Sequence, residues 1–258
     1  MYVERPPGAD LADRVACEWR RAGDTDLTAL VVPDACVDLI WGPSGPFVAG
    51  PDTGPMPVSM RAGDTLVGIR FKPGAVGDFF GVPLTDLRDA RVPLRDLPGH
   101  DTFLSELAEQ AAEHAPAAQP GLTERPDLTA LPGLTEHPAS TEARSHALRA
   151  AVRRRLMRST ATDPAAPVIA SALRKGGTVT EVAWALGFSE RQLQRRSLTS
   201  FGYAPKTLQR IVRFQRALKL ARAGVPLAEV AATAGYTDQA HLANDVKRLS
   251  GVPMRQLI

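Results

Sequence analysis

Cysteine is scarce in this chain, which has only Cys17 and Cys36 among its 258 residues. A structural zinc site takes four ligands, and neither thiol belongs to a zinc-type spacing. Both cysteines lie in apolar segments, which favours inert, buried thiols, with a thiol sensor as the alternative. We therefore expect no metal site and no cofactor.

Long apolar runs are also missing. No stretch approaches the ~18 consecutive apolar residues of a membrane helix. The segment from Met1 to Arg21 lacks the apolar centre of a signal peptide. We expect a cytoplasmic protein that makes no membrane contact.

The usual catalytic patterns are absent from the sequence. It contains no Ser-His-Asp set, no glycine loop that would cradle a phosphate, and no metal-binding pair of histidines. A DNA alkyl-repair enzyme fused to a DNA-binding module would need a zinc-bound cysteine cluster and a reactive Pro-Cys-His motif, and this chain has neither. The sequence therefore predicts a protein that is not an enzyme.

Net charge is small but unevenly distributed. The whole chain carries +3, yet residues 168–258 hold 14 Lys and Arg against 5 Asp and Glu. The residues before them hold 17 basic against 23 acidic side chains. A basic terminal segment on an acidic body indicates a module that binds a polyanion.

The sequence pattern of the first hundred residues predicts a β-rich domain. Short apolar runs at 27–32, 37–41, 47–49 and 66–71 are cut by Pro, Gly, Asp and Ser. Such spacing predicts the short strands of a barrel or a sandwich-like domain. Short helices are expected at Leu11–Arg20 and Ala75–Phe80, and a longer one over 102–114.

A proline-rich duplication follows. The run Pro-Gly-Leu-Thr-Glu occurs at 120 and again at 132, which is typical of a flexible insert, with a partner-binding motif as the alternative. The helix expected over 142–157 contains Arg153, Arg154 and Arg155. This run is interpreted as a solvated face or a connector, with DNA phosphates as the alternative contact.

Helical periodicity in the last part of the chain predicts six helices near 164–175, 178–186, 189–201, 205–223, 227–234 and 237–250. Ser189 and Thr237 are expected as N-caps. The fold class is α+β in two domains: a β-rich barrel or sandwich-like domain at 1–115, and an all-α domain at 163–258. The insert at 116–140 and a connecting helix at 141–162 lie between them.

Two segments of the helical region follow one plan. Val179–Ser189 and Leu227–Thr237 each carry a mid-helix Ala, a Gly four residues later, an aromatic and a hydroxyl residue. A helix-turn-helix needs a small residue where its helices cross and a glycine where its turn takes positive φ. One copy would also fit an ordinary helical hairpin. Two copies 48 residues apart favour a doubled helix-turn-helix.

The helix after each turn is expected to enter the major groove of DNA. Arg pairs there with guanine, and Gln or Asn with adenine. The candidates for reading bases are Glu190, Arg191, Gln194, Arg195, Gln239, His241 and Asn244. The candidates for phosphate contacts are Ser189, Lys206, Arg210, Arg213, Thr237, Lys247 and Arg248.

A long helix is expected between the two motifs. At ~1.5 Å per residue, Pro205–Ala223 spans about 28 Å, close to the ~34 Å of one turn of B-DNA. The sequence thus predicts two sub-sites about ten base pairs apart on one face of the duplex.

The last part of the chain, about 164–258, resembles the AraC/XylS family of regulators. The residues that carry the resemblance are Ala183, Gly187, Phe188, Ser189, Gly202, Pro205, Ala231, Gly235, Tyr236, Asp238, His241, Lys247, Gly251 and Pro253. Gly202–Lys206 and Arg213–Ala217 look like one branch of that family. That branch usually has an arginine where Asn244 stands, which shifts the expected base preference of the second sub-site.

The N-terminal half is similar to the companion domain of that branch, a domain of unknown function. The matching segments are 32–34, 36–41, 49–53 and 67–75, with Ala35 where the pattern usually has Gly. The resemblance implies a domain that binds a small-molecule effector or only dimerises or contacts a partner. It also implies double-stranded DNA as a partner, with RNA polymerase and a homodimer as further candidates.

The candidates for an effector pocket are Trp19, Cys36, Asp38, Trp41 and Arg70. Aromatic core packing is the commoner role for the two tryptophans. Charges beside apolar strands need partners. For Asp34, Asp38 and Arg70 an internal ion pair is slightly favoured over a bound effector.

Overall fold

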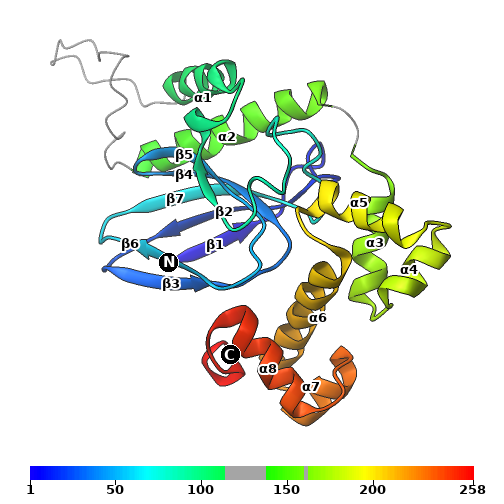
Figure 1. Ribbon diagram of the computed structural model, residues 1–258. Helices are drawn as coiled ribbons and strands as arrows, with labels where there is room; N and C mark the ends of the chain where they lie inside the picture. Colours follow the sequence, from blue (N-terminus) through cyan, green and yellow to red (C-terminus); the bar gives the residue numbers. More distant parts are fainter. Residues whose placement is uncertain (114–137, 160–161) are drawn as a thin grey trace, which may run out of the picture.

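The computed structural model describes residues 1–113, 138–159 and 162–258. The β-rich N-terminal half and the helical C-terminal half confirm the predicted fold class (Figure 1). The predicted insert lies outside the described residues as far as position 137.

Strands of the N-terminal half form two sheets, and all their pairings are antiparallel. The larger sheet has the order β1-β2-β7-β4-β5-β8, and β3 and β6 form a separate two-stranded ribbon. The bounds are β1 Tyr2–Arg5, β2 Val15–Ala22, β3 Leu27–Val31, β4 Val37–Gly42, β5 Gly45–Ala49, β6 Met56–Met60, β7 Thr65–Phe71 and β8 Arg91–Pro93.

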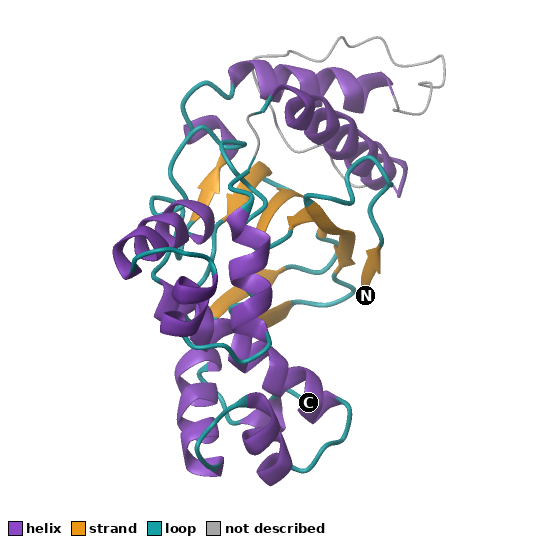
Figure 2. Cartoon of the chain, turned by 90° about the vertical axis from the view of Figure 1, so that its right-hand side faces the viewer, coloured by secondary structure: helices purple, strands orange, loops and turns teal. Residues whose placement is uncertain are grey.

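Helices α1 and α2 cover one face of the large sheet, and the remaining helices form the C-terminal half (Figures 1 and 2). Their bounds are α1 Asp101–Glu113, α2 Pro138–Arg158, α3 Ala165–Arg174, α4 Val179–Ala185, α5 Glu190–Phe201, α6 Pro205–Arg222, α7 Leu227–Ala234 and α8 Gln239–Ser250. Short 3₁₀ turns occur at Leu94–Asp96 and Met254–Gln256. The helices predicted over 102–114 and 142–157 are confirmed, as are the six of the C-terminal half.

Side-chain alternation along β4 separates the two faces of the sheet. Val37, Leu39 and Trp41 point into the core beneath α1 and α2. Asp38 and Ile40 point to the opposite face, because successive residues of a strand alternate. The sheet therefore has one face that packs against helices and another that carries charged groups.

The helix predicted at Leu11–Arg20 is wrong. Residues from Val15 form β2, which lies between β1 and β7 in the sheet. Trp19 pairs across from Gly68, where an added Cβ would come within 2.4 Å of the indole ring. Packing in the tertiary structure overrides the helical propensity of this Ala- and Arg-containing segment.

The helix predicted at Ala75–Phe80 is also wrong. Gly77 has φ +59° and Gly81 has φ +68°, so the segment makes turns instead of a helix. Phe79 and Phe80 still reach the core, with their ring centroids 4.9 Å apart. The apolar spacing therefore correctly predicts that these side chains are buried, but the segment does not form the predicted helix.

The two halves of the chain are in direct contact. Ala35 packs into the core of the C-terminal helices, and its φ of +68° explains why the pattern usually has Gly here. Gln215 Nε2 of α6 donates to the carbonyl of Pro33 at 2.6 Å. The proposed domain boundaries stay predictions.

Gly50 allows two loops to approach each other at the end of β5. An added Cβ would lie 1.7 Å from the carbonyl oxygen of Leu87, so the backbone would have to move. We expect Gly50→Ala to lower the free energy of unfolding by about 1–3 kcal/mol or more. Denaturant unfolding measures this change.

Gly54→Ala is the matched control, because an added Cβ there meets no atom within 4 Å. We expect its free energy of unfolding to stay within about 0.5 kcal/mol of the unmodified protein. Equal midpoints for the two variants would contradict the close approach at Gly50.

Candidate nucleic-acid interface and ligand cavity

The first helix-turn-helix consists of α4 and α5. Thr178 and Glu181 form a capping box at the start of α4, and Ser189 and Gln192 form one at the start of α5. Gly187 takes φ +66° in the turn. These local contacts fix the direction in which α5 leaves the turn.

The second helix-turn-helix repeats this geometry in α7 and α8. Gly235 takes φ +86°. The backbone N–H of Tyr236 donates to the carbonyl of Ala231 at 2.9 Å, as that of Phe188 does to Ala183 in the first copy. The doubled motif predicted from the sequence is confirmed.

Asp238, not Thr237, is the N-cap of α8. Its carboxylate accepts a hydrogen bond from the backbone N–H of His241 at 2.7 Å. The prediction for Thr237 was wrong by one residue, because both residue types can cap a helix and the turn geometry decides between them. The N-cap at Ser189 is confirmed.

Helix α6 joins the motifs and spans about 27 Å at ~1.5 Å per residue. One continuous core includes Leu193 of α5, Phe214 of α6 and Leu242 of α8. Both recognition helices are therefore anchored to the same helix.

The outward face of α5 presents Glu190, Arg191, Gln194 and Arg195, all exposed. The last three line a cleft of 740 Å³ whose opposite wall is the loop around Leu84 of the N-terminal half. The first recognition helix thus faces the other half of the chain across this cleft.

The outward face of α8 presents the exposed side chains of Gln239, Asn244, Lys247 and Arg248. His241 is half-buried instead. Its ring lies edge-on to Tyr236 at 5.2 Å, and its Nδ1 is 3.3 Å from the hydroxyl of Thr237. The remaining phosphate candidates on α6 are Lys206, which is exposed, and Arg210, which is half-buried.

Arg213 makes internal contacts that the sequence analysis did not anticipate. Its guanidinium pairs with Asp245 of α8 at 2.6 Å and lies 4.3 Å from the ring centroid of Tyr236. Burial raises the pKa of Tyr236 to about 12. The sequence does contain a signal for this ion pair. Asp245 lies between Leu242 and Val246 on the buried face of α8, and a buried carboxylate needs a partner.

A second cavity, of 740 Å³, lies on the charged face of the sheet. Its walls come from that face, the β3–β6 ribbon and α6, which contributes Gln215, Leu218 and Arg222. Of the sequence candidates, Trp19, Cys36, Asp38 and Arg70 line it together. Trp41 does not, because it points into the core on the other face.

Arg70 organises the charges in this cavity. Its Nε lies 3.1 Å from Asp38, and its Nη1 lies 3.8 Å from Asp34 and 3.6 Å from Glu4. The indole N–H of Trp19 also donates to Asp38, at 2.8 Å. Burial raises the pKa of Asp38 to about 6, although Arg70 opposes the shift. The internal ion pair expected from the sequence is present.

The cysteines are in environments that favour the protonated thiol. Burial raises the pKa of Cys17 to about 11 and raises that of Cys36 well above its usual value. Asp34 and Asp38 add to the shift at Cys36. A thiol with a raised pKa is a poor nucleophile at neutral pH.

Two kinds of feature are absent from the described residues. Over 1–113, 138–159 and 162–258, no group of three or more His, Cys, Asp or Glu side chains could hold a metal ion. Among the helices in that part of the chain, none has the length and apolar character needed to cross a bilayer.

Comparisons with known proteins place two family matches on the chain. Residues 3–93 match the family described as Domain of unknown function (DUF6597), and residues 182–258 match the Helix-turn-helix domain family. None of the curated proteins matches the chain.

Among solved structures, similar chains are those of ToxT from Vibrio cholerae. An apo lysine-to-alanine variant has 11% identity and a TM-score of 0.46, covering 93% of this chain and 96% of its own. ToxT from strain O395 has 10% identity and a TM-score of 0.42, covering 93% and 95%. ToxT with an unsaturated fatty acid bound has 9% identity and a TM-score of 0.38, covering 99% and 93%. At these identities and scores, the likeness carries no information on function.

The two family matches fall on the two halves that the structure distinguishes. The helix-turn-helix match covers α5 through α8, where the repeated turn geometry lies. The match of unknown function covers the strands of the N-terminal half. The chain thus combines a C-terminal helix-turn-helix domain of the AraC type, a domain of DNA-binding transcription regulators, with this N-terminal domain of unknown function.

Proposed function

We propose that this protein reads two neighbouring DNA sub-sites and that a small molecule bound in the cavity beside Arg70 controls it. The observation that supports binding to two sub-sites is the pair of helix-turn-helix motifs joined by the single helix α6. Two recognition helices on the common core of α6 keep a fixed separation, which suits successive major grooves.

The exposed face of each recognition helix supplies the base-reading candidates. In α5 these are Glu190, Arg191, Gln194 and Arg195, and in α8 they are Gln239 and Asn244. His241 and Arg213 also make internal contacts in the second motif, and their base and phosphate contacts stay predictions. The phosphate contacts are assigned to Lys206, Lys247 and Arg248, with Ser189 and Thr237 at the helix starts.

The cavity favours control by an effector because both halves of the chain build it. Gln215, Leu218 and Arg222 of α6 form part of its wall. Arg213, on the same helix, holds Asp245 of the second recognition helix. A ligand that changes how α6 sits against the sheet would therefore change the placement of α8 and the width of the cleft beside α5.

A ligand-independent regulator, whose N-terminal domain only dimerises or binds a partner, is the alternative. The ion pairs that already link the charged side chains of the cavity favour that alternative. Contacts with RNA polymerase and with a second copy stay predictions. We expect the protein to act in the cytoplasm, where a bacterial-type regulator meets its DNA.

Genomic DNA that binds the protein should contain paired sub-sites. We expect sheared fragments captured by the purified full chain, and then sequenced, to be enriched in two short motifs about ten base pairs apart. Enrichment of single motifs at random spacing would contradict two-site binding.

Arg195 on α5 should contribute to base recognition. We expect Arg195→Ala to lower affinity for the enriched site by more than about 1 kcal/mol, while affinity for random DNA falls less. Arg61→Ala removes the same charge from an exposed position of the N-terminal half and serves as the control. Unchanged discrimination between the enriched site and random DNA in Arg195→Ala would remove this residue from the base-reading set.

Narrowing the cavity should prevent the effector from binding. Val58 of β6 lines the cavity, whereas the adjacent Ser59 is exposed and does not. We expect a metabolite that raises the melting temperature of the unmodified protein to have no such effect on Val58→Trp. Ser59→Trp is the matched control and should keep the shift. A ligand shift that survives in both variants would place the effector elsewhere.

A further inference from the structure

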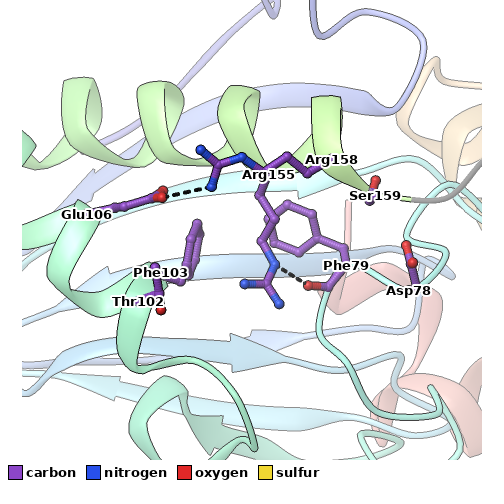
Figure 3. Close-up of a pocket in the computed structure, with 8 residues that line it drawn as sticks. All are labelled: Asp78, Phe79, Thr102, Phe103, Glu106, Arg155, Arg158 and Ser159. Atoms are coloured by element: carbon purple, nitrogen blue, oxygen red, sulfur yellow. Dashed lines mark hydrogen bonds and ion pairs between the residues drawn. The ribbon is translucent and has the colours of Figure 1, made fainter.

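Three arginines stack on aromatic rings in the part of the chain that the structure describes. One is Arg155, which was predicted as part of a solvated or connecting face and lies in a pocket of 230 Å³ under α1 and α2 (Figure 3). Its guanidinium carbon lies 5.5 Å and 5.1 Å from the ring centroids of Phe79 and Phe103, and its Nε donates to the carbonyl of Phe79 at 2.6 Å. The other two, Arg196 and Arg213, lie in the C-terminal half, and each of them also pairs with an aspartate.

Arg196 belongs to the first recognition helix, α5. Its guanidinium carbon lies 4.5 Å from the ring centroid of Phe188, the aromatic residue of the turn before α5. Its Nη1 lies 2.7 Å from both carboxylate oxygens of Asp163, which is located between α2 and α3. Oδ1 of Asp163 also accepts from the backbone N–H of Ala165 at 3.0 Å, at the start of α3. Arg196 therefore ties α5 to the segment between α2 and α3.

Arg213 of α6 makes the same two kinds of contact in the second motif. Its guanidinium carbon lies 4.3 Å from the ring centroid of Tyr236, the aromatic residue of the turn before α8. Its Nη2 lies 2.6 Å from Oδ2 of Asp245 in α8. The side chains of Asp163 and Asp245 are only 16% and 11% exposed, so solvent screens these two pairs less than a surface pair.

Arg196 and Asp245 occupy the same position in the two recognition helices. Each lies seven residues after the N-cap and six residues before the C-cap glycine. In α5 the helix supplies the guanidinium, whereas in α8 the helix supplies the carboxylate. The charge on the helix is reversed, yet the guanidinium lies over the turn aromatic in both motifs. Two different sets of residues thus build one arrangement, which indicates that the arrangement itself matters for the recognition helix.

The location of these pairs suits control of helix rotation. Leu193 and Leu242 anchor the two helices in the common core, but apolar burial is non-directional. Arg196 and Asp245 follow those leucines by three residues, so they lie about one turn further along the same face. A charge-assisted hydrogen bond to a defined partner is directional and fixes the angle of the helix at that point.

We propose that Asp163 and Arg213 are positioning residues for DNA recognition and that each sets the rotation of one recognition helix. Arg195 of α5 and Asn244 of α8 directly precede the paired residues. At ~100° per residue, their direction toward a base edge follows the rotation that the pair sets. Asp163 thus acts on the sub-site that α5 reads, and Arg213 acts on the sub-site that α8 reads. This inference rests on the proposed reading of two sub-sites.

Discrimination at each sub-site can be measured for the full chain with three duplexes. These are the captured site and two copies of it, each with one sub-site scrambled. We expect Asp163→Asn to lower discrimination at one sub-site about fivefold, because a charge-assisted hydrogen bond becomes a neutral one, and to leave the other within about twofold. Arg213→Met should lower discrimination at the other sub-site by at least as much. The new amide can still accept from Ala165, so the start of α3 is kept.

Matched controls remove the same charges elsewhere. Asp24→Asn removes an exposed carboxylate of the N-terminal half, and Lys219→Met removes an exposed cation of α6. Both should leave discrimination at the two sub-sites unchanged. Arg213→Lys keeps the charge without the planar fork, and it takes the place of Arg213→Met if that variant fails to fold.

Two measurements separate positioning from other roles of Arg213. Loss of a phosphate contact would reduce the slope of log affinity against log salt concentration by about 1, whereas loss of a positioning contact leaves the slope unchanged. The double variant Arg213→Asp with Asp245→Arg gives the second motif the polarity of the first. It should recover most of the discrimination that Arg213→Asp alone loses. A purely structural role would lower the melting temperature without changing discrimination by the folded protein.

Amide hydrogen exchange without DNA gives an independent readout. Arg213→Met should speed exchange in α8 but not in α5, and Asp163→Asn should do the reverse. Captured DNA without paired motifs would contradict the proposed function and leave this readout in place. Equal loss of discrimination at both sub-sites in each variant, or unchanged exchange in both helices, would overturn the inference.

Discussion

Burial of α6 is the constraint on which the C-terminal half depends. α4 has 7 residues and α7 has 8, lengths at which an isolated helix is marginal in water. Both are stabilised by packing on α6, where Leu208, Phe214 and Leu218 belong to one core. Since the two motifs share this core, neither can shift without disturbing the other. The fixed separation of the recognition helices follows from packing rather than from the turns themselves.

The same helix also connects the DNA-binding half to the sheet. Gln215 bonds to the Pro33 carbonyl, and Ala35 inserts its methyl group into the helical core. On another side of α6, Arg213 reaches Asp245 of α8. Partly buried charge pairs of this kind are sensitive to misalignment, because separating them leaves a charge without its partner. Helix α6 therefore contacts both the N-terminal half and the second recognition helix.

Alternation along the strands gives the two faces of the large sheet different surroundings. The face under α1 and α2 is apolar and ends at the pocket around Arg155. The other face carries the charges centred on Arg70, which pairs with Asp38 across two strands in register. A shift by one residue in that register would exchange the two faces, so strand pairing is as important to the cavity as the charged residues themselves.

The sequence by itself determined the doubled helix-turn-helix, because small residues, glycines and caps act over a few residues and repeat at a fixed spacing. It also determined which residues of α5 point outward, since helical period settles that. Only the tertiary structure decided that the segment around Trp19 is a strand, that Trp41 and Asp38 face opposite ways, and that Arg213 serves the core. These outcomes depend on partners distant in the chain, such as Gly68 and Asp245, and local propensity contains no information about such partners.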